Sequence, residues 1–298
     1  MPKPPPASRP RRSRVLEQVP ALTPHLYVPT AERPVRGKLH RMQADTEVAT
    51  HTHPWAQLTF SATGVVRLST ADSTYIVPPT RAVWVPSGVA HAVTVLEDAD
   101  LRTVYIRQRP GRCGPEVDPK SEAEWRQCRV LDVSPLLRAL VLELDTRPDQ
   151  GGGCEPAVLV REQHLGALVL DELRRAQAVR LGVDLPDDKR LRALCQAVLQ
   201  QPTRHETLDG WARDAGASPR TMARLFRQEL GTTFLAWRQQ VLLAKALSLA
   251  ARKLPMSHIA AELGYASPSA FTAMVRRSVG MPPSRFFGAQ AESAEAAA

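Results

Sequence analysis

The sequence predicts an α+β protein with an N-terminal antiparallel β-barrel, a helical connector and a C-terminal all-α domain that contains two helix-turn-helix motifs. Three observations lead to this prediction. Short runs rich in Val, Ile, Thr and aromatic residues recur between positions 35 and 107. Helical spacing of apolar residues replaces them from position 134 onward. The region 186–287 then repeats one helical pattern within itself.

The barrel prediction depends on strand-like runs separated by turn signals such as ATG, TADS and PSG. The runs are 56–60, 64–70, 74–79, 82–86 and 101–107. Short strands with this even spacing are typical of a small antiparallel barrel or sandwich. We therefore predict a β-barrel over residues 21–108, which a Pro/Gly linker follows over residues 108–120.

Two strongly apolar helices are predicted after the linker. The first, 134–146, begins with Ser134-Pro135, a favoured pair at a helix N-terminus. The second covers 156–177, after a glycine-rich break. Either helix could cap the barrel or pack against a partner chain. We therefore assign 121–185 as a helical connector and dimerisation region, and we expect a homodimer.

The ends of the chain differ from the middle in composition. Residues 1–20 are predicted to be a disordered basic arm, without the apolar segment of a secretory signal, and residues 288–298 a disordered tail. No run of about 18 apolar residues predicts a membrane span. The four cysteines form no C-x-x-C pair, which argues against a disulfide framework and a cysteine zinc site. We expect a cytoplasmic protein.

Positive charge is concentrated in the C-terminal region. The chain carries a formal net charge of +9, whereas residues 15–185 carry −2 and residues 186–287 carry +8. A further +5 lies in the first 14 residues. Concentrated positive charge on one folded region indicates a polyanionic partner such as nucleic acid.

The basic region contains an internal repeat, because segment 212–231 resembles segment 260–280. Both have a small residue, a glycine four positions later and then a Ser-Pro pair. Glycine tolerates the positive φ of a tight turn, serine caps the next helix, and apolar residues at positions +4, +7 and +8 form its buried face. The repeat predicts two helix-turn-helix units, which a continuous helix over 233–252 connects.

These residues resemble the DNA-binding domain of the AraC/XylS family of bacterial transcription regulators. The resemblance covers 208-LDGWARDAGASPRTMARLFRQELG-231 and 262-ELGYASPSAFTAMVRRSVGMPPSRFF-287, within a domain at 186–287. It implies a unit that reaches two adjacent major grooves of double-stranded DNA, usually within a dimer. RNA polymerase is a further candidate partner.

The exposed faces of the two predicted recognition helices supply the candidate DNA contacts. Arginine can bond guanine in a bidentate way, and Arg220 and Arg224 share a helix face. In the second unit Ala273 stands where Arg224 stands in the first. We therefore expect the second unit to contribute more to phosphate contacts than to base recognition. The predicted base-reading residues are Arg220, Thr221, Arg224, Ser269 and Thr272, and the predicted phosphate or backbone contacts are Ser218, Arg227, Ser267, Arg276 and Arg277.

The barrel region resembles the two cupin motifs. The first motif corresponds to His51, His53, Gln57 and Gly64, with Gln57 in place of the usual glutamate, and the second to Pro86, Gly88 and His91. The glycines expected before each block are replaced by Asp45 and Thr80. The resemblance implies a ligand-sensing barrel. The other histidines, His25, His40, His164, His205 and His258, lack such spacing and are expected at the surface or in helix packing.

Three imidazoles suit a divalent transition metal such as Ni, Zn, Fe or Co. The predicted metal ligands are His51, His53, Gln57 and His91, and Trp55 and Trp84 are predicted as aromatic walls of an effector pocket. An organic ligand without metal and a purely structural histidine set are the two alternatives. We expect a transcription regulator controlled by a metal or small-molecule effector. The alternative function is a cupin metalloenzyme, such as a dioxygenase or isomerase, fused to a DNA-binding domain.

Overall fold

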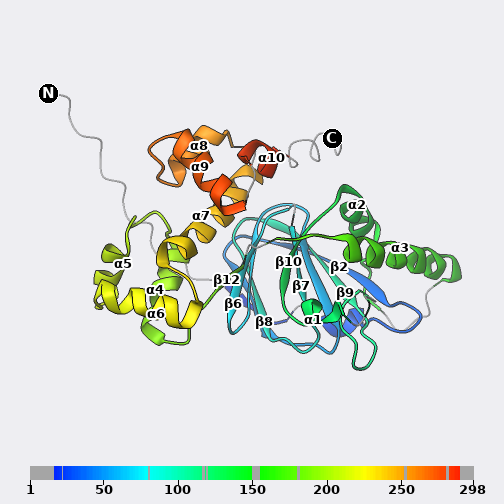
Figure 1. Ribbon diagram of the computed structural model, residues 1–298. Helices are drawn as coiled ribbons and strands as arrows, with labels where there is room; N and C mark the ends of the chain where they lie inside the picture. Colours follow the sequence, from blue (N-terminus) through cyan, green and yellow to red (C-terminus); the bar gives the residue numbers. More distant parts are fainter. Residues whose placement is uncertain are drawn as a thin grey trace.

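The computed structural model describes residues 17–288, apart from positions 22, 80, 116–117, 119, 150–154, 180–181, 252–253 and 280–281. A sheet-rich N-terminal domain is followed by a helical C-terminal domain, as the sequence predicted (Figure 1). The expectation of a disordered arm and tail falls largely on residues 1–16 and 289–298, which lie outside the described residues.

Two six-stranded sheets make up the N-terminal domain. The first has the strand order β1-β3-β8-β5-β6-β12 and the second β11-β10-β7-β4-β9-β2. The strands are β1 Glu17–Val19, β2 Val35–Met42, β3 Thr46–His51, β4 Ala56–Ser61, β5 Val66–Ser69, β6 Ser73–Val77, β7 Arg81–Val85, β8 His91–Val95, β9 Ala99–Ile106, β10 Arg129–Asp132, β11 Ala178–Val179 and β12 Gly182–Asp184. Adjacent strands run antiparallel, except that β1 pairs with β3 in parallel.

Alternation along the strands separates an inner from an outer face of the second sheet. Val83 and Val85 pack into one core with Val66 and Val93 of the first sheet. Side chains on the opposite face form a second core under the connector helices, among them Leu58, Phe60, Trp84 and Val104. The sheet is therefore buried on both faces.

Strands of the sheet domain extend beyond the predicted barrel, residues 21–108, at both ends. Residues 17–19, assigned to the disordered arm, form β1, and the region assigned as a helical connector supplies β10, β11 and β12. β10 pairs with β7, and β12 pairs with β6. The backbone N–H and C=O groups of β6 and β7 need partners, and these short strands provide them. Strands of two to four residues have too few side chains for a recognisable period.

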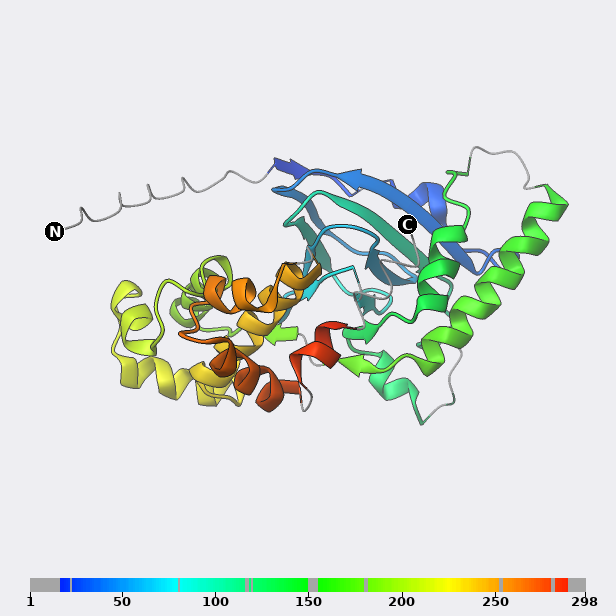
Figure 2. The same cartoon turned by 90° about the horizontal axis from the view of Figure 1, so that it is seen from above.

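The connector helices cover the outer face of the second sheet (Figure 2). They are α1 Glu122–Trp125, α2 Pro135–Glu143 and α3 Pro156–Arg175. A separate short 3-10 helix, η1 Pro24–Tyr27, precedes β2 near the start of the chain. The hydroxyl of Ser134 accepts a hydrogen bond from the backbone N–H of Leu137 at 2.9 Å, which confirms the predicted N-cap. Of the two expectations for these helices, capping the sheet domain is confirmed for their buried faces.

The C-terminal domain is helical throughout its described part. Its helices are α4 Lys189–Gln200, α5 Leu208–Asp214, α6 Pro219–Leu230, α7 Phe234–Ala251, α8 Met256–Glu262, α9 Pro268–Val279 and α10 Pro283–Gly288. Helices α5 and α6 form the first helix-turn-helix unit and α8 and α9 the second, with α7 between them (Figure 1). The predicted apolar stripes are buried, namely Met222, Leu225 and Phe226 on α6 and Phe271, Met274 and Val275 on α9.

Candidate functional site: a histidine cluster and a helix-turn-helix surface

Three histidines from the predicted motifs meet inside the sheet domain. His51 ends β3 and pairs across the sheet with His91, the first residue of β8, while His53 lies in the loop that follows β3. The ring centroids of His51 and His91 are 4.4 Å apart, and those of His53 and His91 are 5.2 Å apart. One ring nitrogen from each of the three lies within 4.8 Å of the others. The structure thus brings together three of the four predicted metal ligands as one cluster.

Backbone carbonyls fix the orientation of all three rings. The Nδ1 atoms of His51, His53 and His91 contact the carbonyl oxygens of Ala49, Trp55 and Val89 at 2.9, 2.7 and 2.9 Å. A carbonyl oxygen only accepts hydrogen bonds, so each Nδ1 carries the proton. In the neutral form of each ring, the Nε2 atom is then left with a free lone pair. This arrangement is usual for histidines that bind metals.

Burial favours the neutral form of two of the three rings. His91 is fully buried, and burial lowers its pKa to about 4. Burial also lowers the pKa of His53. The Nε2 atom of His91 is buried and has no hydrogen-bond partner among the described residues. A buried lone pair without a partner is costly in a metal-free protein and is satisfied by a metal ion.

The fourth predicted ligand, Gln57, reaches the cluster from the second sheet. Its Oε1 lies 2.9 Å from Nε2 of His53, and its Nε2 donates to the hydroxyl of Thr59 at 2.8 Å. When the proton of His53 is on Nδ1, the lone pair of its Nε2 faces a lone pair of Gln57 Oε1. They repel one another unless a cation lies between them or the amide is turned. Ligands bonded to one metal at about 2.1 Å are themselves about 3 Å apart when they subtend a right angle, so the residues fit a metal ion.

Two aromatic side chains adjoin the histidines. The ring of Trp55 stacks on His53 with centroids 5.3 Å apart, and Tyr105 contacts both rings at 5.4 and 5.5 Å. The indole Nε1 of Trp55 is buried without a partner among the described residues, so it can donate to a ligand. Tyr105 was not predicted, although its position opposite Gln57 on β9 follows from strand pairing.

Trp84, the second predicted wall of the effector pocket, lies elsewhere. It is fully buried in the outer core, where its indole N–H donates to the carbonyl of Trp125 at 2.9 Å and the two rings lie edge to face. Strand alternation explains this placement, because Val83 and Val85 occupy the inner face of β7 and Trp84 therefore occupies the outer one. The prediction for Trp84 is corrected accordingly.

Besides the fully buried Arg36, two basic side chains on β2 have inward-facing surroundings: Lys38 is buried and His40 is half-buried. Lys38 is only 3% exposed, and its Nζ lies 5.4 and 5.8 Å from the ring centroids of Tyr27 and Tyr105. Burial lowers the pKa of Lys38 to about 8. His40, expected at the surface or in helix packing, has a buried Nε2 without a partner in the described part of the chain, and burial lowers its pKa to about 4. Sequence patterns missed both because lysine and histidine on a strand usually indicate an exposed face.

The backbone before the first motif explains one departure from the cupin pattern. Asp45, which stands in place of a glycine, has a φ of 66°. Aspartate tolerates this left-handed conformation better than most residues. Gly64 at the end of the motif has a φ of 69°, and a Cβ there would lie 2.2 Å from the carbonyl oxygen of Asp98. The turn geometry of the motif is therefore present despite the changed residue. Thr80 lies outside the described residues.

The first helix-turn-helix unit presents a basic surface. Arg220, Arg224 and Arg227 are exposed on α6, and Thr221 is half-buried. Ser218 caps α6, since its hydroxyl accepts from the backbone N–H of Thr221 at 3.1 Å. Gly216 and Gly231 have φ values of 62° and 60°, as the turn and the helix end require.

The second unit presents fewer long polar side chains. Ser269, Arg276 and Arg277 are exposed on α9, and Thr272 is half-buried. The hydroxyl of Ser267 accepts from the backbone N–H of Ala270 at 3.2 Å, which matches the cap of the first unit. Gly264 in the turn has a φ of 78°. The predicted DNA-facing residues of both units thus lie on or beside the exposed faces of α6 and α9.

A sheet domain with an inward-facing ligand cluster, joined to two helix-turn-helix units, defines a ligand-binding transcription regulator. Comparison with known proteins agrees: residues 38–159 match the AraC-like ligand binding domain, and residues 211–289 match a helix-turn-helix domain. The chain belongs to the AraC family of DNA-binding transcription regulators. None of the described helices is long and apolar enough to cross a membrane.

Individual relatives support this assignment. The chain is 29% identical to the HTH-type transcriptional regulator NimR of Escherichia coli over 79% of this chain and 81% of that protein. It is 28% identical to the arabinose operon regulatory protein of Escherichia coli over 38% of this chain and 40% of that protein. The solved structure of ToxT from Vibrio cholerae has a TM-score of 0.35 and 11% identity, covering 86% of this chain and 98% of that chain. The family assignment is based on the family matches and the two sequence relatives and not on this structure.

Proposed function

We propose that this regulator is controlled by an effector bound at the histidine cluster, and that a divalent transition metal such as Ni, Zn, Fe or Co occupies His51, His53 and His91. Gln57 would add a neutral oxygen ligand. The observation that supports this most directly is the fully buried Nε2 of His91, which has no partner among the described residues. The neutral state of His91 and His53 favours metal binding because only a deprotonated Nε2 can ligate.

Elemental analysis of the purified full-length protein tests the metal proposal. We expect close to one metal ion per chain in the wild type and a large loss in a His51→Ala/His53→Ala variant. A matched control is His164→Ala/His258→Ala, which removes two exposed histidines outside the cluster. Equal and negligible metal in all three proteins would overturn the proposal.

A metal-chelating organic molecule is the second form that the effector can take. The indole N–H of Trp55 is a donor without a hydrogen-bond partner among the described residues, and the ammonium group of Lys38 is a second donor, with Tyr105 as an apolar wall between them. A ligand with anionic oxygen atoms would satisfy these donors and the metal together. Metal-dependent binding of such an anion would separate this form from a regulator that senses the ion alone.

Binding rather than turnover is the proposed role of the cluster. Regulators of this family use the N-terminal domain for ligand binding, and its relatives compared above are transcription regulators. A bound ligand that persists shifts the equilibrium between domain arrangements, whereas a product that leaves does not. The cupin dioxygenase or isomerase alternative would be supported instead by metal-dependent consumption of oxygen or of a substrate. We also propose a cytoplasmic location and, as part of its regulatory role, contact with RNA polymerase.

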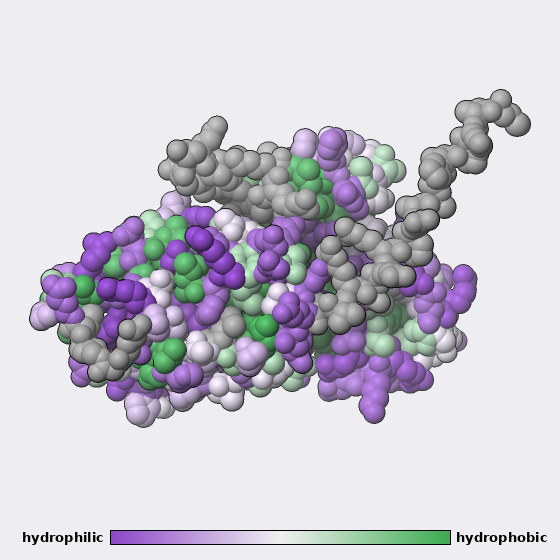
Figure 3. All heavy atoms as spheres, turned by 180° about the vertical axis from the view of Figure 1, so that it is seen from behind, coloured by the Kyte–Doolittle hydropathy of each residue, from purple (hydrophilic) through white to green (hydrophobic). Residues whose placement is uncertain are grey.

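A homodimer is proposed through the outward faces of α2 and α3. Leu136, Val160 and Leu168 are 51, 50 and 48% exposed on these helices, and Val160 and Leu168 lie eight residues apart on one face of α3. Figure 3 shows hydrophobic side chains among hydrophilic ones on this side of the molecule. Light scattering of a Val160→Glu/Leu168→Glu variant tests the proposal: the wild type should be dimeric and the variant monomeric. A dimeric variant would rule out this surface.

A further inference from the structure

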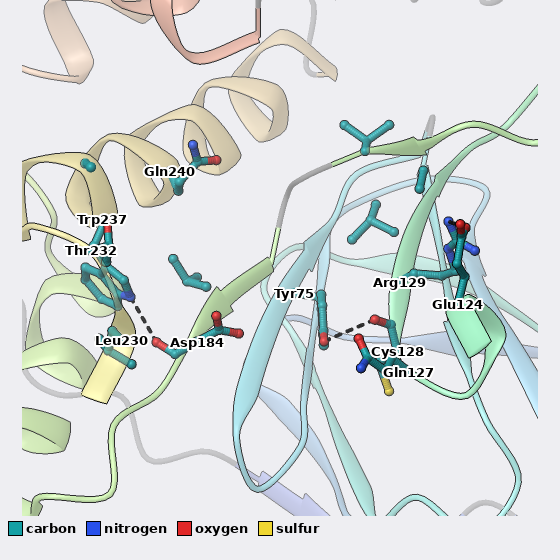
Figure 4. Close-up of a pocket in the computed structure, with 15 residues that line it drawn as sticks. Tyr75, Glu124, Gln127, Cys128, Arg129, Asp184, Leu230, Thr232, Trp237 and Gln240 are labelled. Carbon is teal, nitrogen blue, oxygen red and sulfur yellow. Dashed lines mark hydrogen bonds and ion pairs between the residues drawn. The ribbon is translucent and has the colours of Figure 1, made fainter. Parts of the chain in front are cut away.

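A cavity of about 590 Å³ lies between the sheet domain and the first helix-turn-helix unit (Figure 4). The sheet domain contributes Tyr75 and Val130 to its walls, and the helical domain contributes Trp237 and Gln240 from α7. β12, which pairs with β6, contributes Asp184 at the boundary of the two domains. No histidine of the cluster lines this cavity. It is therefore a site separate from the proposed effector site.

Acceptor groups in the lining of the cavity have capacity for further hydrogen bonds. Oε1 of Gln240 is buried and has no partner among the described residues. The carboxylate of Asp184 accepts a hydrogen bond from the hydroxyl of Ser73 at 2.8 Å and forms no ion pair with a described residue. The one guanidinium in the lining, that of Arg129, is paired with Glu124 at 3.0 Å. The buried amide oxygen of Gln240, together with the exposed carboxylate of Asp184 and the exposed amide of Gln127, thus remains for a ligand that donates hydrogen bonds.

The rest of the lining is largely apolar. Val130, Val179 and Val183 lie on the sheet side, and Leu230 and Ala236 lie on the helical side. Cavities of roughly 300–1,000 Å³ with such walls and a few polar groups are typical of small-molecule sites, which occur preferentially at domain interfaces. An apolar body would bury surface here, while a protonated nitrogen would supply the missing donors.

We propose that this interdomain cavity binds an organic amine, with its ammonium group at the buried Oε1 of Gln240 and its apolar body against the three valines, in a lining that also carries the Asp184 carboxylate. The walls belong to two domains, so the amine binds tightly only when those domains have this relative placement. It would therefore bias the position of α6, whose last residue, Leu230, lines the cavity. Because the coupling is reciprocal, operator DNA and the amine would change each other's affinity by the same factor.

Calorimetric titration of the full-length protein tests the ligand class. The probes are 2-phenylethylamine, benzylamine and tryptamine, and phenylacetate serves as a ligand of similar shape and opposite charge. We expect saturable binding of at least one amine at one site per chain, and no binding of phenylacetate. Absence of binding for all three amines, or equal binding of phenylacetate, would overturn the proposal.

Substitutions in the lining test the location. Ala236→Trp fills the cavity and should abolish amine binding, whereas Leu235→Trp, at the neighbouring position, which is 59% exposed and outside the lining, should leave it unchanged. Gln240→Leu should weaken binding about tenfold through loss of one hydrogen bond to a charged group. Gln240→Glu should strengthen it. Thermal unfolding of each variant confirms that the fold is intact, and unchanged affinity in both Ala236→Trp and Gln240→Leu would place the amine elsewhere.

The same titration in the His51→Ala/His53→Ala variant separates this proposal from the proposed effector site. Amine binding should persist there, because the cavity and the histidine cluster share no lining residue. DNA affinity measured with and without the bound amine should change in the wild type and stay constant in Ala236→Trp. An amine that binds the wild type without changing DNA affinity would refute the regulatory part.

Discussion

Nε2 of His53 lies 2.9 Å from Oε1 of Gln57. The contact connects the loop after β3, a strand of one sheet, with β4, a strand of the other. This contact places an uncharged oxygen where a cupin motif has a carboxylate. A Gln57→Glu substitution should raise the affinity for a divalent metal at least about tenfold, because it adds a negative charge next to the ion. Competition titration with a chelator measures the change.

The control for that charge is Gln163→Glu on the exposed face of α3, which should leave metal affinity unchanged. A Gln57→Leu variant should bind metal more weakly than the wild type, since it removes the oxygen. Identical affinities for the glutamate, leucine and native side chains would show that position 57 is not a ligand.

Lys38 should destabilise the protein at neutral pH. Its pKa is lowered to about 8 in the fold, against about 10.5 for an unfolded lysine, so folding disfavours its charged form. Stability should be lowest below pH 8 and should rise as the pH increases from 8 to about 10.5. Lys38→Met should therefore raise the free energy of unfolding at pH 7 by about 2 kcal/mol, after allowing for the lost cation–π contacts.

Urea denaturation at pH 7 and pH 10 measures this effect, and the gain should shrink at the higher pH. Lys120→Met, at an exposed loop position, is the control and should change little. A destabilised Lys38→Met variant at pH 7 would mean that the ammonium group has a stabilising partner in solution.

His91 should make the metal-free protein sensitive to mild acid. Its pKa is about 4 in the fold and about 6.5 in the unfolded chain, so the unfolded state gains a proton first as the pH falls. The stability from this depressed pKa is present above pH 6.5 and is lost between about 6.5 and 4. Between pH 7 and pH 5 the loss should be about 2 kcal/mol.

A His91→Gln variant should lose this part of the pH dependence, whereas His164→Gln, exposed on α3, should keep it. Unfolding curves in the presence of a chelator give both values. An unchanged slope in His91→Gln would assign the acid sensitivity to other groups.

Removal of an arginine should affect DNA binding differently in the two recognition helices. Arg224→Ala should relax sequence preference at one or two positions of the site, at a cost of ~1–3 kcal/mol for the preferred base, because an exposed arginine on α6 can bond guanine. Arg276→Ala should weaken binding to all sequences alike and reduce the salt dependence.

Binding-site selection followed by affinity measurements at several salt concentrations distinguishes these outcomes. The selected sequences of Arg276→Ala should match those of the wild type. If Arg224→Ala also selects the wild-type sequence, Arg224 holds a phosphate rather than a base.

The helical domain could be predicted closely because its information is local. The Ser-Pro pairs, the turn glycines and the apolar positions determine capping, turn geometry and burial within about twenty residues of chain, as Ser218, Gly216 and Met222 illustrate. The sheet domain was predicted less well. β10, β11 and β12 are short strands whose partners lie far away in the sequence, so pairing rather than local propensity forms them.

The two helix-turn-helix units, the basic surface and the set of histidines could be read from the chain alone, because residue type and spacing specify each of them. Tertiary structure decided which side chains share the interior. In the folded protein Trp84 lies in the outer core, Tyr105 contacts His53, and Lys38 lies near the rings of Tyr27 and Tyr105. Sheet register and packing set which face of a strand becomes the interior. A shift in register of one residue would exchange the two faces, and residue spacing alone does not fix that register.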